Sequence, residues 1–393
     1  MTPPLTARLV RAKDLDMSLD GAGILTVRTL GGSVSIPSQG LRLLDAFEKP
    51  TLVRDAVEKL TVGGARDFID ATSIIATLIK AGILHDPEQP GALPRDNSRW
   101  DATGIHVEML RDDVRTDGFR RAIEEVVRPG DIVLDIGTGS GVLAVFAARA
   151  GAKKVYAVEA SSIAPIARQV FDKSGVGDRV EVIRGWSTQI ELPERADVLV
   201  TETIGNEPLG ERIVDTAFDA RRRLLVPGAR MIPSRVLVRA RLVTLSRAVR
   251  ATHLAGGTNE ELVRERYRVD ISPLAAAENR STFPLTLEAD EVKTLTPLSD
   301  VFTIADVDLA TTDLVFQRRV EAVAARAGTM DGVLLHFSAT LSDATTLTVD
   351  AFELDHSSWR SYLWVVPPRQ VSVGDQVALT YDHAAGMATI VVP

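Results

Sequence analysis

The stretch Val133-Leu134-Asp135-Ile136-Gly137-Thr138-Gly139-Ser140-Gly141 decides the fold, because an apolar run ends in three alternating glycines. It predicts a buried strand, a sharp turn and a helix over residues 142–150. The three glycines have no Cβ, so the backbone can turn tightly and a ligand can approach it closely. Glu159 closes the next predicted strand, residues 154–160, where a carboxylate can accept both hydroxyls of a ribose. The stretch therefore predicts a nucleoside site rather than a bare structural turn.

Strands and helices alternate around this turn. The predicted strands are residues 132–136, 154–159, 179–184 and 197–202. Such alternation predicts an α/β fold with a parallel sheet and right-handed crossovers. Ligands bind at the carboxyl ends of parallel strands, and the residues expected there are Gly137, Glu159, Gly185 and Glu202.

The glycine spacing and two further segments carry a resemblance to a known family. Residues 135–141 read D-x-G-x-G-x-G, the spacing used for S-adenosylmethionine, and do not meet the dinucleotide pattern G-x-G-x-x-G. Residues 104–116 resemble the segment that opens the catalytic core of protein arginine N-methyltransferases, and residues 201–211 resemble that family's double-glutamate loop. The likeness covers about residues 99–393. It implies a class I methyltransferase with a Rossmann-like sheet, S-adenosyl-L-methionine as cofactor and S-adenosyl-L-homocysteine as product.

The resemblance assigns roles to particular residues. Glu202 and Glu211 are implied to be catalytic and to bind and orient a basic nitrogen, while Glu207 in the same loop is expected to be solvated. The substrate-binding residues it implies are Glu108, Met109 and Trp359. Arg115 is implied to bind the methionyl carboxylate, and the other cofactor-binding residues are Asp135, Gly137, Gly139, Gly141, Glu159, Ser187 and Thr188. Of these, Asp135 is expected to act mainly through hydrogen bonds to the glycine turn. Two plainer alternatives stay open: Glu211 could favour the start of the next helix, and Arg115 could form a surface ion pair.

Three departures from the family pattern concern the site. The family's Tyr-Phe-x-x-Tyr motif is absent from residues 96–100, where only Trp100 is aromatic. The histidine of its Thr-His-Trp loop is replaced by Ser358, and its adenine-contacting acid is replaced by Thr188. Because the aromatic groups and the histidine shape the acceptor pocket of the family, these departures leave the identity of the substrate open. They do not change the predicted cofactor.

Residues 1–86 predict a winged-helix-like domain. Two strands, 24–29 and 33–36, flank Gly31-Gly32, and three helices follow at 41–47, 52–60 and 65–81. The third carries an apolar stripe of Phe68, Ala71, Ile75, Leu78 and Ile79. The pattern resembles PqqD-like domains, which serve as leader-peptide recognition elements and hold a leader as an added strand. The alternatives are a packing or dimerisation role, and winged-helix DNA binding, which the few basic residues of the third helix disfavour.

The rest of the chain predicts a linker and a β domain. Residues 87–98 contain three prolines and a glycine and are expected to be a linker between the N-terminal domain and the cofactor domain of residues 99–232. Residues 233–393 predict an antiparallel, β-barrel-like substrate domain. Its predicted strands are 236–243, 300–304, 317–323, 332–339, 345–353, 362–366, 376–382 and 388–392. Helical material is expected near 260–267, and the resemblance implies a dimerisation arm near residues 247–285.

Composition sets the outer limits. The chain of 393 residues is 45% hydrophobic and 25% charged, with a net charge of −8, which argues against nucleic-acid binding and suits a cationic substrate. It has no cysteine, so no disulfide, thiol nucleophile or cysteine-based metal site is expected, and no metal is predicted. Neither a signal peptide nor a membrane span is apparent, which predicts a cytoplasmic enzyme.

Three functions follow from these observations. The first is N-methylation of an amine or guanidinium in a ribosomally made peptide, with the precursor peptide held by the N-terminal domain. The second is methylation of protein arginine or free arginine, with a structural N-terminal domain. The third is a non-catalytic scaffold, which the retained glycines and glutamates argue against. A homodimer is expected for either enzyme.

Overall fold

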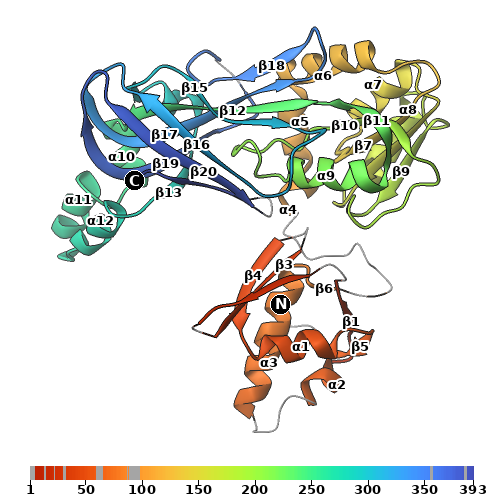
Figure 1. The fold of residues 1–393 in the computed structure, drawn as a ribbon, viewed down its shortest axis with the longest axis horizontal. Helices are drawn as coiled ribbons and strands as arrows, with labels where there is room; N and C mark the ends of the chain where they lie inside the picture. The colour runs from red at the N-terminus through yellow and green to blue at the C-terminus, as the bar shows by residue number, and fades with distance from the viewer. Residues whose placement is uncertain are drawn as a thin grey trace.

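The computed structural model describes residues 5–12, 15–21, 23–29, 32–58, 65–85, 87, 98–354, 357–384 and 387–393. Figure 1 shows three parts in chain order: an N-terminal part in red and orange, a parallel α/β part, and a β part in green to blue. Most of the predicted linker, residues 88–97, lies outside the described residues.

A parallel sheet in the middle of the chain confirms the predicted α/β arrangement. Its strands are β7 (Ile132–Ile136), β8 (Lys154–Glu159), β9 (Val180–Arg184), β10 (Ala196–Thr201) and β11 (Leu225–Ile232). Their order is β11-β10-β7-β8-β9, and every neighbouring pair is parallel. The chain order reverses between β7 and β10, so a ligand crevice is expected there, outside the carboxyl ends of the strands. Strand β7 is buried along its whole length, as a strand covered on both faces requires.

Helices connect and cover this sheet. They are α4 (Ser98–Asp101), α5 (Thr103–Leu110), α6 (Asp113–Val126), α7 (Val142–Arg149), α8 (Ala164–Lys173) and α9 (Ile213–Arg223). Helix α6 is capped by Asp112, whose side chain accepts a hydrogen bond from the Arg115 backbone N–H at 3.1 Å. It buries Phe119, Ala122 and Ile123, which follow the helical period. The cap thus fixes where Arg115 leaves the first turn.

The C-terminal part forms two antiparallel sheets. Its strands are β12 (Arg235–Thr244), β13 (Phe283–Leu287), β14 (Thr296–Pro297), β15 (Phe302–Asp308), β16 (Phe316–Val323), β17 (Gly328–Thr340), β18 (Thr346–Val349), β19 (Ser361–Val371), β20 (Gln376–Ala384) and β21 (Met387–Val391). The larger sheet runs β13-β19-β17-β12-β14, with β15 on β12 and β18 on β17; the smaller runs β16-β20-β21. Each of the eight predicted strands overlaps one of these. One continuous apolar core joins both sheets to the parallel sheet.

Short helices interrupt the β part between β12 and β15. They are α10 (Arg247–His253), α11 (Thr258–Tyr267), α12 (Ser272–Glu278) and α13 (Ala289–Val292). The helical material predicted near 260–267 is α11. Helices α11 and α12 bury none of their residues and project from the β part on the side away from the parallel sheet (Figure 1).

The N-terminal part has its own core, from Leu9 to Leu84. Its elements are β1 (Arg8–Arg11), β2 (Asp16–Leu19), β3 (Ile24–Thr29), β4 (Gly32–Pro37), α1 (Gly40–Ala46), β5 (Thr51–Leu52), α2 (Val53–Glu58), α3 (Ala65–Lys80) and β6 (Leu84–His85). Strands β2, β3 and β4 form one sheet, and β5, β1 and β6 another. The predicted hairpin is β3 and β4, and the predicted helices are α1 to α3. On α3 the predicted stripe is wrong at Phe68, which is 40% exposed, whereas Ile75 and Leu78 are fully buried.

Candidate active site

The glycine turn after β7 has a backbone conformation that residues with a side chain would adopt only with strain. Gly137, Gly139 and Gly141 have φ angles of +74°, +53° and +91°, a region that L-residues avoid. A Cβ on Gly139 would lie 3.2 Å from the His106 imidazole, and one on Gly141 would lie 2.4 Å from Cε1 of Phe171. The turn therefore needs glycine for its conformation and for the close approach of its neighbours.

Glu159 ends β8 and faces this turn. Its Oε2 accepts a hydrogen bond from the Gly139 N–H at 2.8 Å, and its Oε1 accepts one from the Ser161 N–H at 2.7 Å. The side chain is largely buried. Two neighbouring strands thus deliver the glycine turn and a fixed carboxylate to one point at the sheet edge.

A cavity of about 610 Å³ opens at the carboxyl ends of β7, β8, β9 and β10, a volume typical of small-molecule sites. Most of the predicted site residues line it: Glu108, Met109, Arg115, Gly137, Gly139, Glu159, Ser187, Thr188, Glu202, Glu211 and Trp359. Residues from the β part, Ser358 to Arg360, close one side. The structure therefore brings the nucleoside motif and the two glutamates to a single space.

Two predicted cofactor residues do not line the cavity. Asp135 is fully buried, and its carboxylate accepts a hydrogen bond from the Thr138 hydroxyl at 2.5 Å. Burial raises the pKa of Asp135 to about 7. Gly141 packs against Phe171 of α8. Both residues shape the turn from behind rather than face a ligand.

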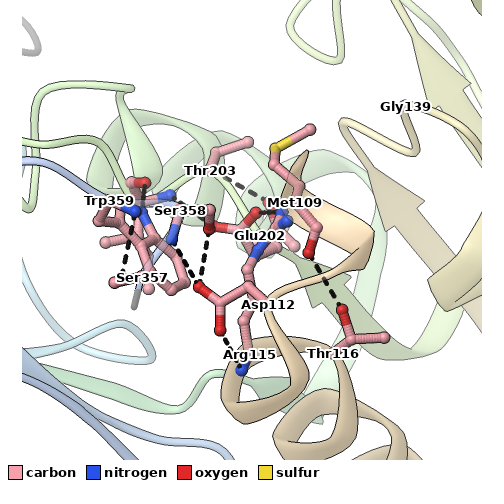
Figure 2. A network of polar contacts seen from close by, with 12 residues as sticks. Met109, Asp112, Arg115, Thr116, Gly139, Glu202, Thr203, Ser357, Ser358 and Trp359 are labelled. Atoms are coloured by element: carbon pink, nitrogen blue, oxygen red, sulfur yellow. Dashed lines mark hydrogen bonds and ion pairs between the residues drawn. The ribbon is translucent and has the colours of Figure 1, made fainter. Parts of the chain in front are cut away.

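Arg115 and Glu202 form a buried ion pair inside the cavity (Figure 2). Their side chains are 14% and 8% exposed, so the alternative of a surface pair for Arg115 is wrong. The guanidinium carbon also lies 5.4 Å from the centre of the Trp359 ring. Burial lowers the pKa of Arg115 to about 10, opposed by the charges of Asp112 and Glu211, which leaves it cationic at neutral pH.

The loop between β10 and α9 folds back on itself, as its glycines predict. A Cβ on Gly205 would lie 2.8 Å from the Glu207 carbonyl oxygen and 3.0 Å from Cγ of Glu211. Only glycine fits this approach, and it brings Glu211 back to the cavity that Glu202 enters from the end of β10. We call residues 202–211 the acceptor loop.

A segment of the β part, residues 357–360, docks on the acceptor loop and on α6 (Figure 2). The Ser358 N–H and hydroxyl both donate to Oδ2 of Asp112, at 2.7 and 2.9 Å. The Trp359 indole N–H donates to the Ile204 carbonyl at 2.6 Å. Ser358, which stands in place of the histidine of the family's Thr-His-Trp loop, therefore satisfies Asp112.

Two residues of the site escaped the sequence reasoning. His106 of α5 is buried against Gly139, and its Nε2 donates to the Trp100 carbonyl at 2.9 Å. Glu207, expected to be solvated, is only 7% exposed, so that expectation is wrong. A signal for Glu207 was present in the sequence: it lies between Gly205 and Gly210, in the part of the loop that must fold inward.

Similarity to known proteins identifies the family. Residues 116–245 match the model of the ribosomal protein L11 methyltransferase (PrmA) family. Protein arginine N-methyltransferase 1 of Schizosaccharomyces pombe is 34% identical over 251 residues, which are 62% of this chain and 69% of that protein. The chain belongs to the protein arginine N-methyltransferase family. This membership confirms, at the level of the family, the predicted enzyme class and the predicted cofactor, S-adenosylmethionine.

Other arginine methyltransferases match a shorter segment. The probable protein arginine N-methyltransferase 6 of Arabidopsis thaliana is 35% identical over 46% of this chain and 40% of its own length. Protein arginine N-methyltransferase 6 of Danio rerio is 45% identical over 33% of this chain and 38% of its own. The chain thus spans about two fifths of the length of these two relatives.

Solved arginine methyltransferases share the fold. The Trypanosoma brucei PRMT1 enzyme–prozyme complex with AdoHcy superimposes with a TM-score of 0.62 at 23% identity, over 72% of this chain and 88% of the other. Arabidopsis thaliana protein arginine methyltransferase 10, in an open conformation, gives 0.58 at 25% identity over the same shares. The relatives favour the arginine alternative over methylation of a ribosomally made peptide.

Proposed function

We propose that this arginine methyltransferase family member transfers a methyl group from S-adenosylmethionine to a guanidinium nitrogen of arginine in a protein. One observation carries the proposal: the folded-back acceptor loop brings Glu202 and Glu211 into the cavity that holds the glycine turn and Glu159. Two carboxylates and a nucleoside site in one space suit the methylation of a cationic nitrogen.

The residues present fit S-adenosylmethionine. Gly137 and Gly139 leave a surface without Cβ atoms at the sheet edge, and Glu159 stands beside it as the acceptor for ribose hydroxyls. Arg115 supplies a cation for the methionyl carboxylate, and Ser187 and Thr188 line the end of the cavity after β9. When bound, the cofactor supplies a methyl group on a positively charged sulfur.

The chain's own residues bind and orient the acceptor. The carboxylates of Glu202 and Glu211 bind a guanidinium by charge-assisted hydrogen bonds. The planar fork of N–H donors on a guanidinium matches two carboxylate acceptors. Arg115 fixes the direction of Glu202 through their ion pair. Trp359 forms one wall of the cavity and is held by its hydrogen bond to Ile204. The glutamates and this wall together can hold one guanidinium nitrogen toward the methyl group of the cofactor. Such positioning accounts for much of the rate of a transfer reaction.

The test is transfer of labelled methyl to a peptide that contains one arginine. A matched peptide with lysine at that place keeps the charge and removes the guanidinium. We expect label in the arginine peptide alone. Label only in the lysine peptide would reject an arginine acceptor, and equal label in both peptides would reject selectivity for the guanidinium.

We also propose a homodimer, formed through the arm of α11 and α12. Both helices bury none of their residues, and the arm exposes Leu262, Tyr267, Val269 and Leu274 by 50% to 63%. Exposed apolar clusters of this kind favour an interface.

A second candidate concerns the N-terminal part, which we propose holds a peptide substrate as an added strand. Strand β4 is an edge strand of the sheet β2-β3-β4 and packs beside α3. Large apolar side chains of this part are also exposed: Ile24 on β3, Leu41 on α1 and Phe68 on α3. An edge strand can pair with an extended peptide. Deletion of residues 1–92 should raise KM for a long substrate and leave KM for a short arginine peptide unchanged. Equal KM values for the long substrate before and after deletion would reject this role.

A further inference from the structure

Glu207 is a buried acid that the proposed chemistry does not use. It lies in the acceptor loop between the two glutamates that face the cavity, yet it points away into the protein. Its Oε2 accepts a hydrogen bond from the Leu209 N–H at 2.9 Å, and its Oε1 accepts one from the Tyr381 hydroxyl at 2.7 Å. A carboxyl group as buried as that of Glu207 is stable only when its oxygens have hydrogen-bond partners, and both oxygens of Glu207 have one.

Its partner belongs to a rigid element far away in the sequence. Tyr381 is fully buried in β20, the central strand of the sheet β16-β20-β21, where it pairs with Arg318 and Ile390. A loop of the parallel α/β part is thus tied, across 174 residues of sequence, to the middle of a sheet in the β part.

The tie acts at the point where the loop reverses. The Gly210 N–H donates to the Glu207 carbonyl at 2.8 Å. A Cβ on Gly210 would lie 3.3 Å from Cβ of Glu207, and one on Gly205 would lie 2.8 Å from its carbonyl oxygen. Glu207 therefore packs against Gly205 and Gly210. These two glycines let the loop fold back, which brings Glu211 to the cavity that Glu202 also lines.

We propose that Glu207 and Tyr381 are a positioning pair, which holds the acceptor loop folded so that Glu202 and Glu211 face the same cavity. The inference rests on the proposed function in one respect, because it takes the two glutamates as the acceptor site. Neither member of the pair lines the cavity, so both act through the loop.

The pair keeps its hydrogen bonds whether or not Glu207 carries a proton. Burial raises the pKa of Glu207 to about 7, so both forms exist near neutrality. The carboxylate accepts from Tyr381 and Leu209, and the acid can donate to Tyr381 while it accepts from Leu209. Tyr362 on β19 is a second tyrosine that the Glu207 charge reaches: burial raises the pKa of Tyr362, and the charge of Glu207 raises it further. A glutamine at 207 can make the same two bonds and should serve as well.

The kinetic test compares four variants. Tyr381→Phe and Glu207→Ala remove the tie, and we expect each to lower kcat for an arginine peptide about tenfold, the effect of one lost buried hydrogen bond. KM for S-adenosylmethionine should stay unchanged, because the glycine turn is untouched. Glu207→Gln and the matched control Tyr362→Phe should keep the wild-type kcat. Equal kcat values in Tyr381→Phe and Tyr362→Phe would overturn the proposal.

A second measurement needs no substrate and so separates this proposal from the proposed function. Hydrogen exchange of the complex with S-adenosylhomocysteine should show about tenfold faster exchange of acceptor-loop amides in Tyr381→Phe. Amides of β7 and β8 should exchange as in the wild type. Unchanged exchange in the loop, or faster exchange spread evenly over the sheet, overturns the positioning role. Failure to methylate arginine, with this exchange pattern present, rejects only the proposed function.

Discussion

Arg115 and Glu202, 87 residues apart in the chain, meet as a buried ion pair in the lining of the cavity. The cap at Asp112 fixes Arg115 on the first turn of α6, and the end of β10 fixes Glu202. The residue implied to bind the cofactor therefore contacts a residue implied to bind the acceptor. A ligand carboxylate that binds some of the N–H groups of Arg115 would therefore change the ion pair that orients Glu202.

This contact predicts that Arg115→Lys weakens both halves of the site. Lysine keeps the charge but lacks the fork needed to reach two carboxylates at once. We expect the affinity for S-adenosylhomocysteine to fall at least about tenfold by calorimetry, with a parallel fall in kcat. The control is Arg120→Lys, on the same helix, whose pairs with Asp117 and Glu124 are exposed. Equal affinities for the two variants would contradict a cofactor role for Arg115.

Glu202→Gln and Glu211→Gln should separate catalysis from cofactor binding. Each removes one negative charge that faces the acceptor, so we expect kcat to fall about 100-fold or more. Affinity for S-adenosylhomocysteine should change less than about threefold. Glu124→Gln, an exposed change on α6, serves as the control. A matching loss of cofactor affinity would mean that the two glutamates are structural.

Gly141→Ala tests the packing of the glycine turn. The new Cβ would meet Phe171 at 2.4 Å, whereas Gly130 has a similar φ of +95° with nothing within 4 Å of an added Cβ. Both alanines suffer backbone strain of about 1 kcal/mol, and only Gly141→Ala adds overpacking of about 1–3 kcal/mol. Urea unfolding should show this difference in the free energy of unfolding. Similar losses in both variants would rule out the contact with Phe171.

Asp135 predicts a pH dependence of stability. Its pKa is about 7 in the folded protein, above the ordinary 3.8, so the native state holds a proton that the unfolded state releases. The stability that Asp135 contributes is present below about pH 4 and is lost as pH rises through 7. Between pH 5 and 8 the free energy of unfolding should fall by about 3 kcal/mol relative to Asp135→Asn. A constant difference across this range would mean that Asp135 titrates normally.

If α11 and α12 form the dimer interface, a single charge introduced there should break the dimer. Leu274→Glu on α12 places a charge on a side chain that is 58% exposed in the single chain. Sedimentation should show a dimer for the wild type and a monomer for this variant, with unchanged far-ultraviolet circular dichroism. Thr258→Glu, at the start of α11, should leave the dimer intact. A wild-type monomer would reject the homodimer.

Local patterns in the sequence were enough to predict the parallel sheet and the cofactor edge. The glycines, Glu159 and Glu202 come at strand ends, and strand ends of a parallel sheet meet at one edge. Eight strands of the β part were predicted because alternation along a half-buried strand is visible locally. Short strands such as β5 and β6 have two residues each and carry no period, so they were missed.

The contacts that cross between parts could not be predicted from spacing. Tyr381 reads as one inward residue of a strand, and nothing local says that its hydroxyl meets Glu207. Asp135 was grouped with the cofactor residues from the resemblance and was expected to act mainly through hydrogen bonds to the turn; it does bond to Thr138 of the turn, which covers it. Phe68 follows the apolar period of α3 and is nevertheless exposed, because the period shows which face is apolar and not what covers it.

The most direct test is tandem mass spectrometry of an arginine-containing protein after incubation with this chain and isotopically labelled S-adenosylmethionine. We predict labelled methyl on arginine guanidinium nitrogens, reduced about 100-fold or more in initial rate with Glu211→Gln. Labelled methyl on any other atom, or no transfer from protein that binds S-adenosylhomocysteine, would contradict the account.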